Sequence, residues 1–214
     1  MPTSRSYGDA CGIARALDVV GERWALLVVR ELLLGPQRFT DLRRGLPHAS
    51  SNMLSDRLRE LDARGVVHRR KLAPPAGSWV YELTDWGRAL EPAVLALGAW
   101  GVQAPPPPES ARLGATSVLL YLRASALPDP AAAPAVYGVQ LDDRMWTVRT
   151  AAGQVHVEPG DPGDPDASVH ATPQVLNAVL ADPATLDAAI ADGRIAVTGD
   201  RAAVRRLLRS VVTS

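Results

Sequence analysis

The chain has 214 residues, and its 23 basic and 23 acidic side chains give a formal net charge of zero. No stretch approaches the roughly 20 uninterrupted apolar residues that a membrane-spanning helix requires, so we expect no membrane partner. The first twelve residues lack the basic region and apolar run of a signal peptide, and the single cysteine, Cys11, cannot form an internal disulfide. We therefore expect a cytoplasmic protein. We also expect two domains, because each half of the chain is long enough to hold its own core.

The basic residues are unevenly distributed along the chain. Residues 1–104 contain 14 basic and 11 acidic side chains, whereas residues 105–214 contain 9 and 12. The excess is concentrated between Arg38 and Lys71, where nine basic residues accompany four acidic ones. A local basic patch attracts phosphate whatever the charge of the whole chain, so the zero net charge does not exclude nucleic-acid binding.

Apolar residues at helical spacing predict four helices at the start of the chain. These are 13–20, 24–34, a short helix that begins at Phe39, and one that runs from Ser50 or Ser51 to Arg64. Thr40 is the expected N-cap of the third helix, and Ser50 and Ser51 are each able to cap the fourth. The short third helix, the tight turn and the longer fourth helix together predict a helix-turn-helix.

Two strands and another helix follow. Residues 66–71 and 79–83 alternate with a period of two, and residues 72–78, with two prolines and a glycine, are predicted to be the loop of a hairpin. Thr84 is expected to cap one long helix over 85–100. Helices followed by a hairpin are the order of a winged helix-turn-helix domain.

The predicted fourth helix has one apolar and one polar side. Leu54, Leu58 and Leu61 lie in a narrow stripe that is expected to face the core. The opposite side carries short hydrogen-bonding groups and an arginine, which suit base edges in a major groove: Asn52, Ser55, Asp56 and Arg59. Any amphipathic helix is polar on its outer side, so this helix alone does not distinguish a DNA-reading helix from an ordinary surface helix. The flanking turn and the basic hairpin favour DNA binding. The expected DNA-binding residues are Thr40, Ser50, Ser51, Asn52, Ser55, Arg59, Arg69, Arg70 and Lys71.

Four consecutive prolines, Pro105 to Pro108, exclude a helix and favour a stiff polyproline II rod. They divide the chain into domains at 1–103 and 110–214, with a linker at 104–109. The second domain is expected to contain a helix over 113–127, strands over 135–141, 145–150, 154–158 and 167–171, helices after Thr172-Pro173 and Asp182-Pro183, a strand within 193–200 and a last helix. The predicted fold class is α+β, with a small, mostly antiparallel sheet in the second domain.

Several separated motifs of the first half occur together in one known family. They are CGIARALDVVGERW at 11–24, REL at 30–32, RFTDL at 38–42, NMLSDRLREL at 52–61 and YELTDWG at 81–87. In this order and spacing they resemble the HxlR family of winged-helix transcriptional regulators, over roughly residues 9–103. The resemblance implies a homodimer on a palindromic DNA operator, with the first and last helices of the domain at the dimer interface and the hairpin as a wing against the DNA backbone. One departure is Gly12, where the family often has proline.

The second half, which ends in GRIAVTGDRAAVRRLL at 193–208, is similar to the sterol-carrier-like (SCP2-like) domain over roughly residues 110–214. In that family the sheet and helices enclose an apolar tunnel for lipid-like molecules. The resemblance implies that an apolar small molecule acts as effector. Tyr137, Met145 and Trp146 are the expected lining of such a pocket, although aromatic residues on strands are more often plain core.

Cys11 supports an alternative function. It lies at the start of the first predicted helix, where the positive end of the helix dipole favours the thiolate, and some HxlR relatives sense oxidants or electrophiles there. In this alternative, the protein is a redox or electrophile sensor that acts through Cys11, and its second domain serves only assembly. The simpler alternative is that Cys11 is a small packing residue.

No motif of a known enzyme class is present. The sequence has no glycine-rich phosphate loop, no Gly-x-Ser-x-Gly and no His-Glu-x-x-His. The four histidines show no metal-ligand spacing, so we expect no metal, no cofactor and no catalysis. The remaining rival is an adaptor whose winged helix contacts only proteins, and such an adaptor would show no salt-sensitive binding to DNA.

Overall fold

The computed structural model describes residues 6–73, 77–105, 107–108 and 111–212. The chain divides into two compact units, Met1–Pro106 and Pro107–Ser214. Of the linker expected at 104–109, Pro106 and Glu109 lie outside the described residues, as do residues 74–76 of the loop expected at 72–78.

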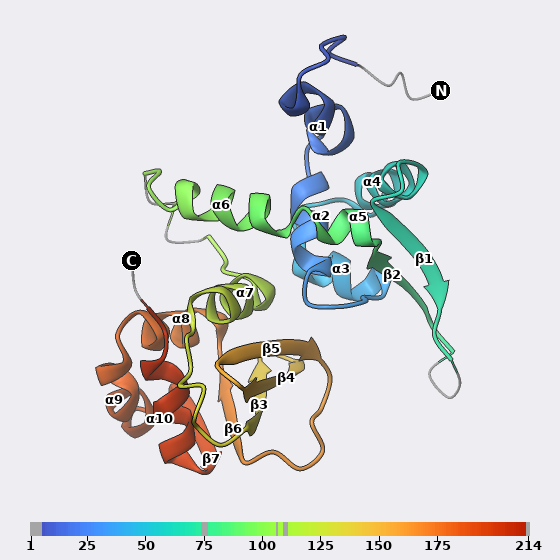
Figure 1. The fold of residues 1–214 in the computed structure, drawn as a ribbon. Helices are drawn as coiled ribbons and strands as arrows, with labels where there is room; N and C mark the ends of the chain where they lie inside the picture. Colours follow the sequence, from blue (N-terminus) through green and yellow to red (C-terminus); the bar gives the residue numbers. More distant parts are fainter. Residues whose placement is uncertain (1–5, 74–76, 106, 109–110, 213–214) are drawn as a thin grey trace. The chain divides into compact units, whose positions relative to one another are not determined.

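The first unit combines helices with one hairpin (Figure 1). Its elements are α1 (Gly12–Val20), α2 (Ala25–Leu32), α3 (Phe39–Gly45), α4 (Ser51–Ala63), β1 (Val67–Lys71), β2 (Trp79–Leu83), α5 (Asp85–Arg88) and α6 (Glu91–Gly101). The two strands pair antiparallel, with Val67 opposite Leu83 and Lys71 opposite Trp79. This confirms the predicted winged helix-turn-helix.

The core of the first unit forms where α4 meets its neighbours. Leu54, Leu58 and Leu61 are buried, as the helical wheel predicts, together with Val28 and Leu42 from α2 and α3. Because these three leucines recur on one side of α4, burying them leaves the opposite side of the helix facing solvent.

Two helix boundaries differ from the prediction. The long helix expected over 85–100 is two helices, because Pro92 in the first turn of α6 has no N–H to donate and its ring would clash with the carbonyl of Arg88. At α3 the N-cap is Arg38, and Thr40 lies inside the helix. The carboxylate of Asp41 accepts the backbone N–H of Arg38 at 3.3 Å, so the side chain that caps the start of α3 is that of Asp41 and not that of Thr40.

Gly87 of α5 is required by close packing against the segment that precedes β1. A Cβ at this position would lie 2.1 Å from the carbonyl oxygen of Val66. We expect Gly87→Ala to lower the thermal midpoint of the first unit, because backbone has to move to relieve the clash. Gly101→Ala, at the end of α6 with no atom within 4 Å of the added Cβ, is the matched control and should leave the midpoint unchanged or slightly raised. Melting curves of the two variants test the contact.

The second unit is a five-stranded sheet with helices on one side (Figure 1). Its elements are α7 (Ala115–Ser125), β3 (Ala135–Leu141), β4 (Arg144–Ala151), β5 (Gln154–Pro159), β6 (Ala167–Ala171), α8 (Pro173–Ala181), the 3-10 turn η1 (Pro183–Thr185), α9 (Leu186–Ala191), β7 (Ile195–Gly199) and α10 (Arg201–Arg209). The strand order is β5-β4-β3-β6-β7, in which only β3 and β6 run parallel. The predicted α+β class with a mostly antiparallel sheet is confirmed.

Alternation along the strands gives this sheet one buried and one more polar face. Tyr137, Val139 and Trp146 belong to the buried face, which the helices cover. Asp200 caps α10, where its carboxylate accepts the backbone N–H groups of Ala203 and Ala202. These bonds hold the pKa of the Asp200 carboxyl below its usual value.

Candidate functional site

The outward side of α4 is a continuous polar surface. Ser50 is the N-cap and its Oγ accepts the backbone N–H of Met53 at 3.2 Å, while Ser51 and Asn52 follow on the exposed first turn. Further along, Arg59 is 73 % exposed and its Nη1 lies 2.9 Å from Oδ1 of Asp56. An exposed ion pair of this kind contributes little, so the Arg59 guanidinium is free to exchange its partner.

The helix α3 adds a second exposed cation beside this surface. Nη1 of Arg43 lies 3.5 Å from Oγ of Ser51, and Thr40 lies one turn earlier on α3 with its side chain exposed. Arg43 was not among the expected DNA-binding residues. The signal for it was the basic excess between Arg38 and Lys71, which does not tell exposed arginines from buried ones.

Arg57 of α4 is buried, and its contacts hold the fold together. Its Nε donates to the backbone carbonyl of Arg23 at 3.1 Å, and its guanidinium pairs with Glu60 and Glu22. These contacts fix α4 to the segment that precedes α2. The orientation of the polar surface therefore depends on Arg57, although Arg57 does not belong to that surface.

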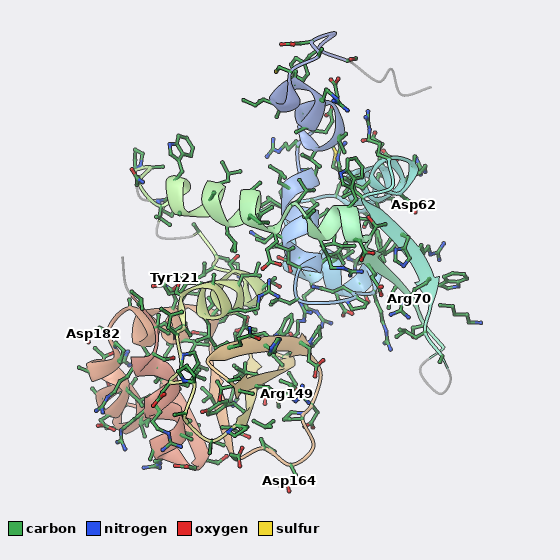
Figure 2. The ribbon with its side chains drawn as sticks, viewed as in Figure 1. Asp62, Arg70, Tyr121, Arg149, Asp164 and Asp182 are labelled. Carbon is green, nitrogen blue, oxygen red and sulfur yellow. The ribbon has the colours of Figure 1, made fainter. Side chains whose placement is uncertain are left out.

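The three basic residues expected on the wing have different surroundings. Arg69 and Lys71 are exposed, whereas Arg70, which is labelled in Figure 2, is half-buried. Its Nε lies 2.7 Å from Oε2 of Glu82. Nε2 of His68 lies 3.8 Å from the other oxygen of the same carboxylate. Arg70 is therefore already neutralised by a partner within the hairpin.

Apolar side chains are exposed on both α1 and α6, and we call them together the apolar surface of α1 and α6. No side chain of α6 is buried, although most of them are apolar, and Trp100 is 70 % exposed. On α1, Ile13 is 76 % exposed and Leu17 is also exposed. An apolar cleft of about 370 Å³ lies between α1 and α5. It is lined by Gly12, Arg15, Ala16, Val19, Val20, Val66, Trp86, Ala89 and Leu90.

Cys11 is the N-cap of α1 and is exposed. Its Sγ accepts the backbone N–H of Ala14 at 3.3 Å, and its own N–H donates to the carboxylate of Asp9 at 2.9 Å. The thiol therefore lies at the positive end of α1, within reach of solvent.

The three residues expected to line a pocket in the second unit do not lie together. Tyr137 and Trp146 are buried on the helix-covered face, while Met145 pairs with Gln140 on the opposite face. Burial raises the pKa of the Tyr137 phenol. Among the described residues the Trp146 indole N–H has no hydrogen-bond partner, and the Arg144 guanidinium lies 4.4 Å from the centre of the indole ring.

None of the helices in the described part of the chain has both the length and the apolar character that a membrane span requires. The described residues also hold no group of three histidine, cysteine or carboxylate side chains placed to bind one metal ion.

Comparison with known proteins separates the two halves of the chain. Residues 19–108 match the HxlR-like helix-turn-helix family, and residues 119–209 match the SCP-2 sterol transfer family. The uncharacterized HTH-type transcriptional regulator YybR of Bacillus subtilis is 38 % identical over 44 % of this chain and 74 % of its own length. A second regulator of that organism, YvaP, is 38 % identical over 42 % of this chain and 82 % of its own length.

A solved structure, the redox regulator HypR in its oxidized form, is 36 % identical and is matched over its whole length by 45 % of this chain. The TM-score of this match is 0.42. The chain therefore belongs to the HxlR-like helix-turn-helix family, and its residues 119–209 are similar to the SCP-2 sterol transfer family.

Proposed function

We propose that this protein is a DNA-binding transcriptional regulator that acts as a homodimer on a palindromic operator, and not an enzyme or a protein-only adaptor. The observation that carries the proposal is the exposed polar side of α4, which lies beside a basic wing in a domain of the HxlR-like family. A helix with this pattern suits the major groove, which presents a distinct set of donors and acceptors for each base pair.

Each part of the surface has its own task in this proposal. Asn52 and Arg59 reach base edges, because they are exposed opposite the buried leucine stripe of α4, and the half-buried Ser55 contributes from the edge of the same polar side. Thr40 at the start of α3 and Ser50 and Ser51 at the start of α4 bind phosphate, and exposed basic residues of the wing add a further contact to the DNA backbone. Phosphate contacts set the position of the domain on the duplex, and base contacts select the sequence.

The homodimer is inferred from the apolar surface of α1 and α6. A helix such as α6, apolar and without a buried side chain, is unusual on a free surface and typical of an interface. A second copy of the chain is its natural partner, because a two-fold dimer places the same apolar surface on both sides. Two α4 helices would then read two half-sites of one operator.

Salt dependence tests DNA binding. We expect the full-length protein to bind a labelled duplex with an affinity that falls steeply as salt rises, since each neutralised phosphate releases counterions. Fluorescence anisotropy titrations at several salt concentrations measure the slope. An adaptor that contacts only proteins would give no salt-dependent binding at all.

We further propose that the second unit binds an apolar small molecule and that this binding changes the affinity for DNA. The buried indole N–H of Trp146 supports the proposal, because a buried donor without a partner is costly and a bound molecule with an acceptor would satisfy it. Arg144 beside the ring adds a cation near the same position. Reciprocity then requires that the ligand and the operator change each other's affinity by the same factor.

Native mass spectrometry of freshly purified protein tests ligand binding directly. We expect a copurified small molecule on the dimer, and its loss or weakening in Trp146→Phe, which keeps an aromatic ring but removes the indole N–H. The expected loss is about tenfold in affinity, the range of one buried hydrogen bond. If the wild-type protein takes up neither a copurified molecule nor an added lipid extract, the second unit serves assembly instead.

Exposure of Cys11 at the start of α1 favours a second candidate function, thiol-based sensing. We expect Cys11→Ser to bind DNA normally in reducing buffer and to lose any response to diamide or peroxide, because the chain has no other cysteine. DNA titrations before and after oxidant measure this. A response that persists in Cys11→Ser would exclude the cysteine as the sensor.

A further inference from the structure

The hairpin has two chemically different sides. Because paired residues of an antiparallel ladder share a side, the register defines both of them. One side carries Arg69, Lys71, Trp79 and Tyr81, and the other carries His68, Arg70, Val80 and Glu82. The first side, which we call the aromatic side, combines two cations with two aromatic rings and has no carboxylate.

Arg69 is held in place on the aromatic side. Its guanidinium carbon lies 4.6 Å from the centre of the Trp79 ring and 5.9 Å from the centre of the Tyr81 ring. Stacking uses the flat face of the guanidinium, so the N–H groups at its edge stay available for an acceptor. A side chain that is already ordered loses less conformational entropy when it binds a phosphate.

Arg70 is paired with a carboxylate of the hairpin, and this pairing makes it unavailable for DNA. Its Nε donates to Glu82 at 2.7 Å, and this carboxylate is only 17 % exposed. To reach a phosphate, Arg70 would have to leave Glu82 and uncover a shielded negative charge. The charge of the pair is zero, so Arg70 adds little to the attraction of the hairpin for DNA.

We propose that the aromatic side is the side of the wing that meets DNA, with Arg69 as its phosphate-binding cation and Trp79 as the residue that positions Arg69. Arg70 makes no contact with DNA while it is paired with Glu82. This inference rests on the proposed DNA-binding function and assigns unequal roles to two neighbouring arginines, which the sequence alone treats alike. Trp79, which is 50 % exposed, acts through Arg69.

The test compares full-length variants on a labelled duplex at several salt concentrations. We expect Arg69→Ala to lower affinity about three- to tenfold and to flatten the salt slope by about one unit, whereas Arg70→Ala changes neither. Trp79→Ala should lower affinity, and its effect should largely vanish in the Arg69→Ala background because both changes remove the same contact. Trp79→Tyr keeps an aromatic ring and should restore binding.

Glu82→Gln provides an independent readout, since it releases Arg70 and should raise affinity and steepen the salt slope. Circular dichroism and melting curves establish that each variant is folded. Equal losses for Arg69→Ala and Arg70→Ala, or full additivity of Trp79→Ala with Arg69→Ala, would overturn the inference while leaving DNA binding intact. If the wild-type protein itself shows no salt-dependent binding, the proposed function fails instead.

Discussion

Leu97→Asp is expected to convert the dimer into a monomer and to weaken operator binding on the order of 100-fold, the typical loss when two linked contacts become independent. Leu97 is exposed on α6 near Trp100, in the apolar surface that we assign to the dimer. An aspartate there would have to leave water without a partner when the second copy approaches. Light scattering measures the mass, which should fall from twice 22.7 kDa to 22.7 kDa.

Leu127→Asp is the matched control for this change. Leu127 is an exposed leucine of the second unit, outside α1 and α6, so the same charge should leave both the mass and the affinity unchanged. A stable dimer of Leu97→Asp would mean that α6 is not at the interface. A monomeric wild-type protein would contradict the assignment more directly.

Arg59→Ala and Asn52→Ala are each expected to cost about 1–3 kcal/mol of discrimination between operator and random DNA. The physical reason is the bidentate pairing of arginine with guanine and of asparagine or glutamine with adenine. Binding to random DNA should change far less than binding to the operator. Anisotropy titrations with both duplexes give the ratio of affinities for each variant.

Arg88→Ala is the control for Arg59→Ala. Both arginines are exposed and each pairs with an aspartate three residues earlier, but Arg88 lies on α5, away from the polar surface of α4. Arg88→Ala should therefore leave the discrimination between operator and random DNA unchanged. If both α4 variants lose the same factor on operator and random DNA, α4 is not the element that reads the sequence.

The α4 surface was predictable because its signal is local. Leucines at a spacing of three and four residues decide which side of a helix is buried, and the polar residues on the opposite side follow from geometry. The helix break at Pro92 was also visible in the sequence, because proline lacks the N–H that a continuous helix needs. The prediction of one long helix gave more weight to the apolar pattern than to the proline.

Other features depend on contacts that no local pattern contains. Arg69 and Arg70 are neighbours in sequence, and only the register of β1 and β2 decides what each of them faces. It places Tyr81 opposite Arg69, and it places Val80 opposite Arg70 on the side of the hairpin that also carries Glu82. The separation of Met145 from Trp146, in contrast, was predictable from the sequence, since neighbours on a strand point to opposite faces of the sheet. The exposure of α6 was expected only from the resemblance to the HxlR family, because an apolar helix has the same pattern whether its partner is its own core or a second chain.

In the proposed function, two copies of this chain read a symmetric DNA sequence through α4. Selection from a pool of random duplexes by the full-length protein tests it most directly. We predict that the enriched sequences are inverted repeats whose half-site centres lie about 10–10.5 base pairs, one helical turn, or a multiple of that apart. Enrichment of sequences without inverted symmetry, or no enrichment at all, would contradict the account.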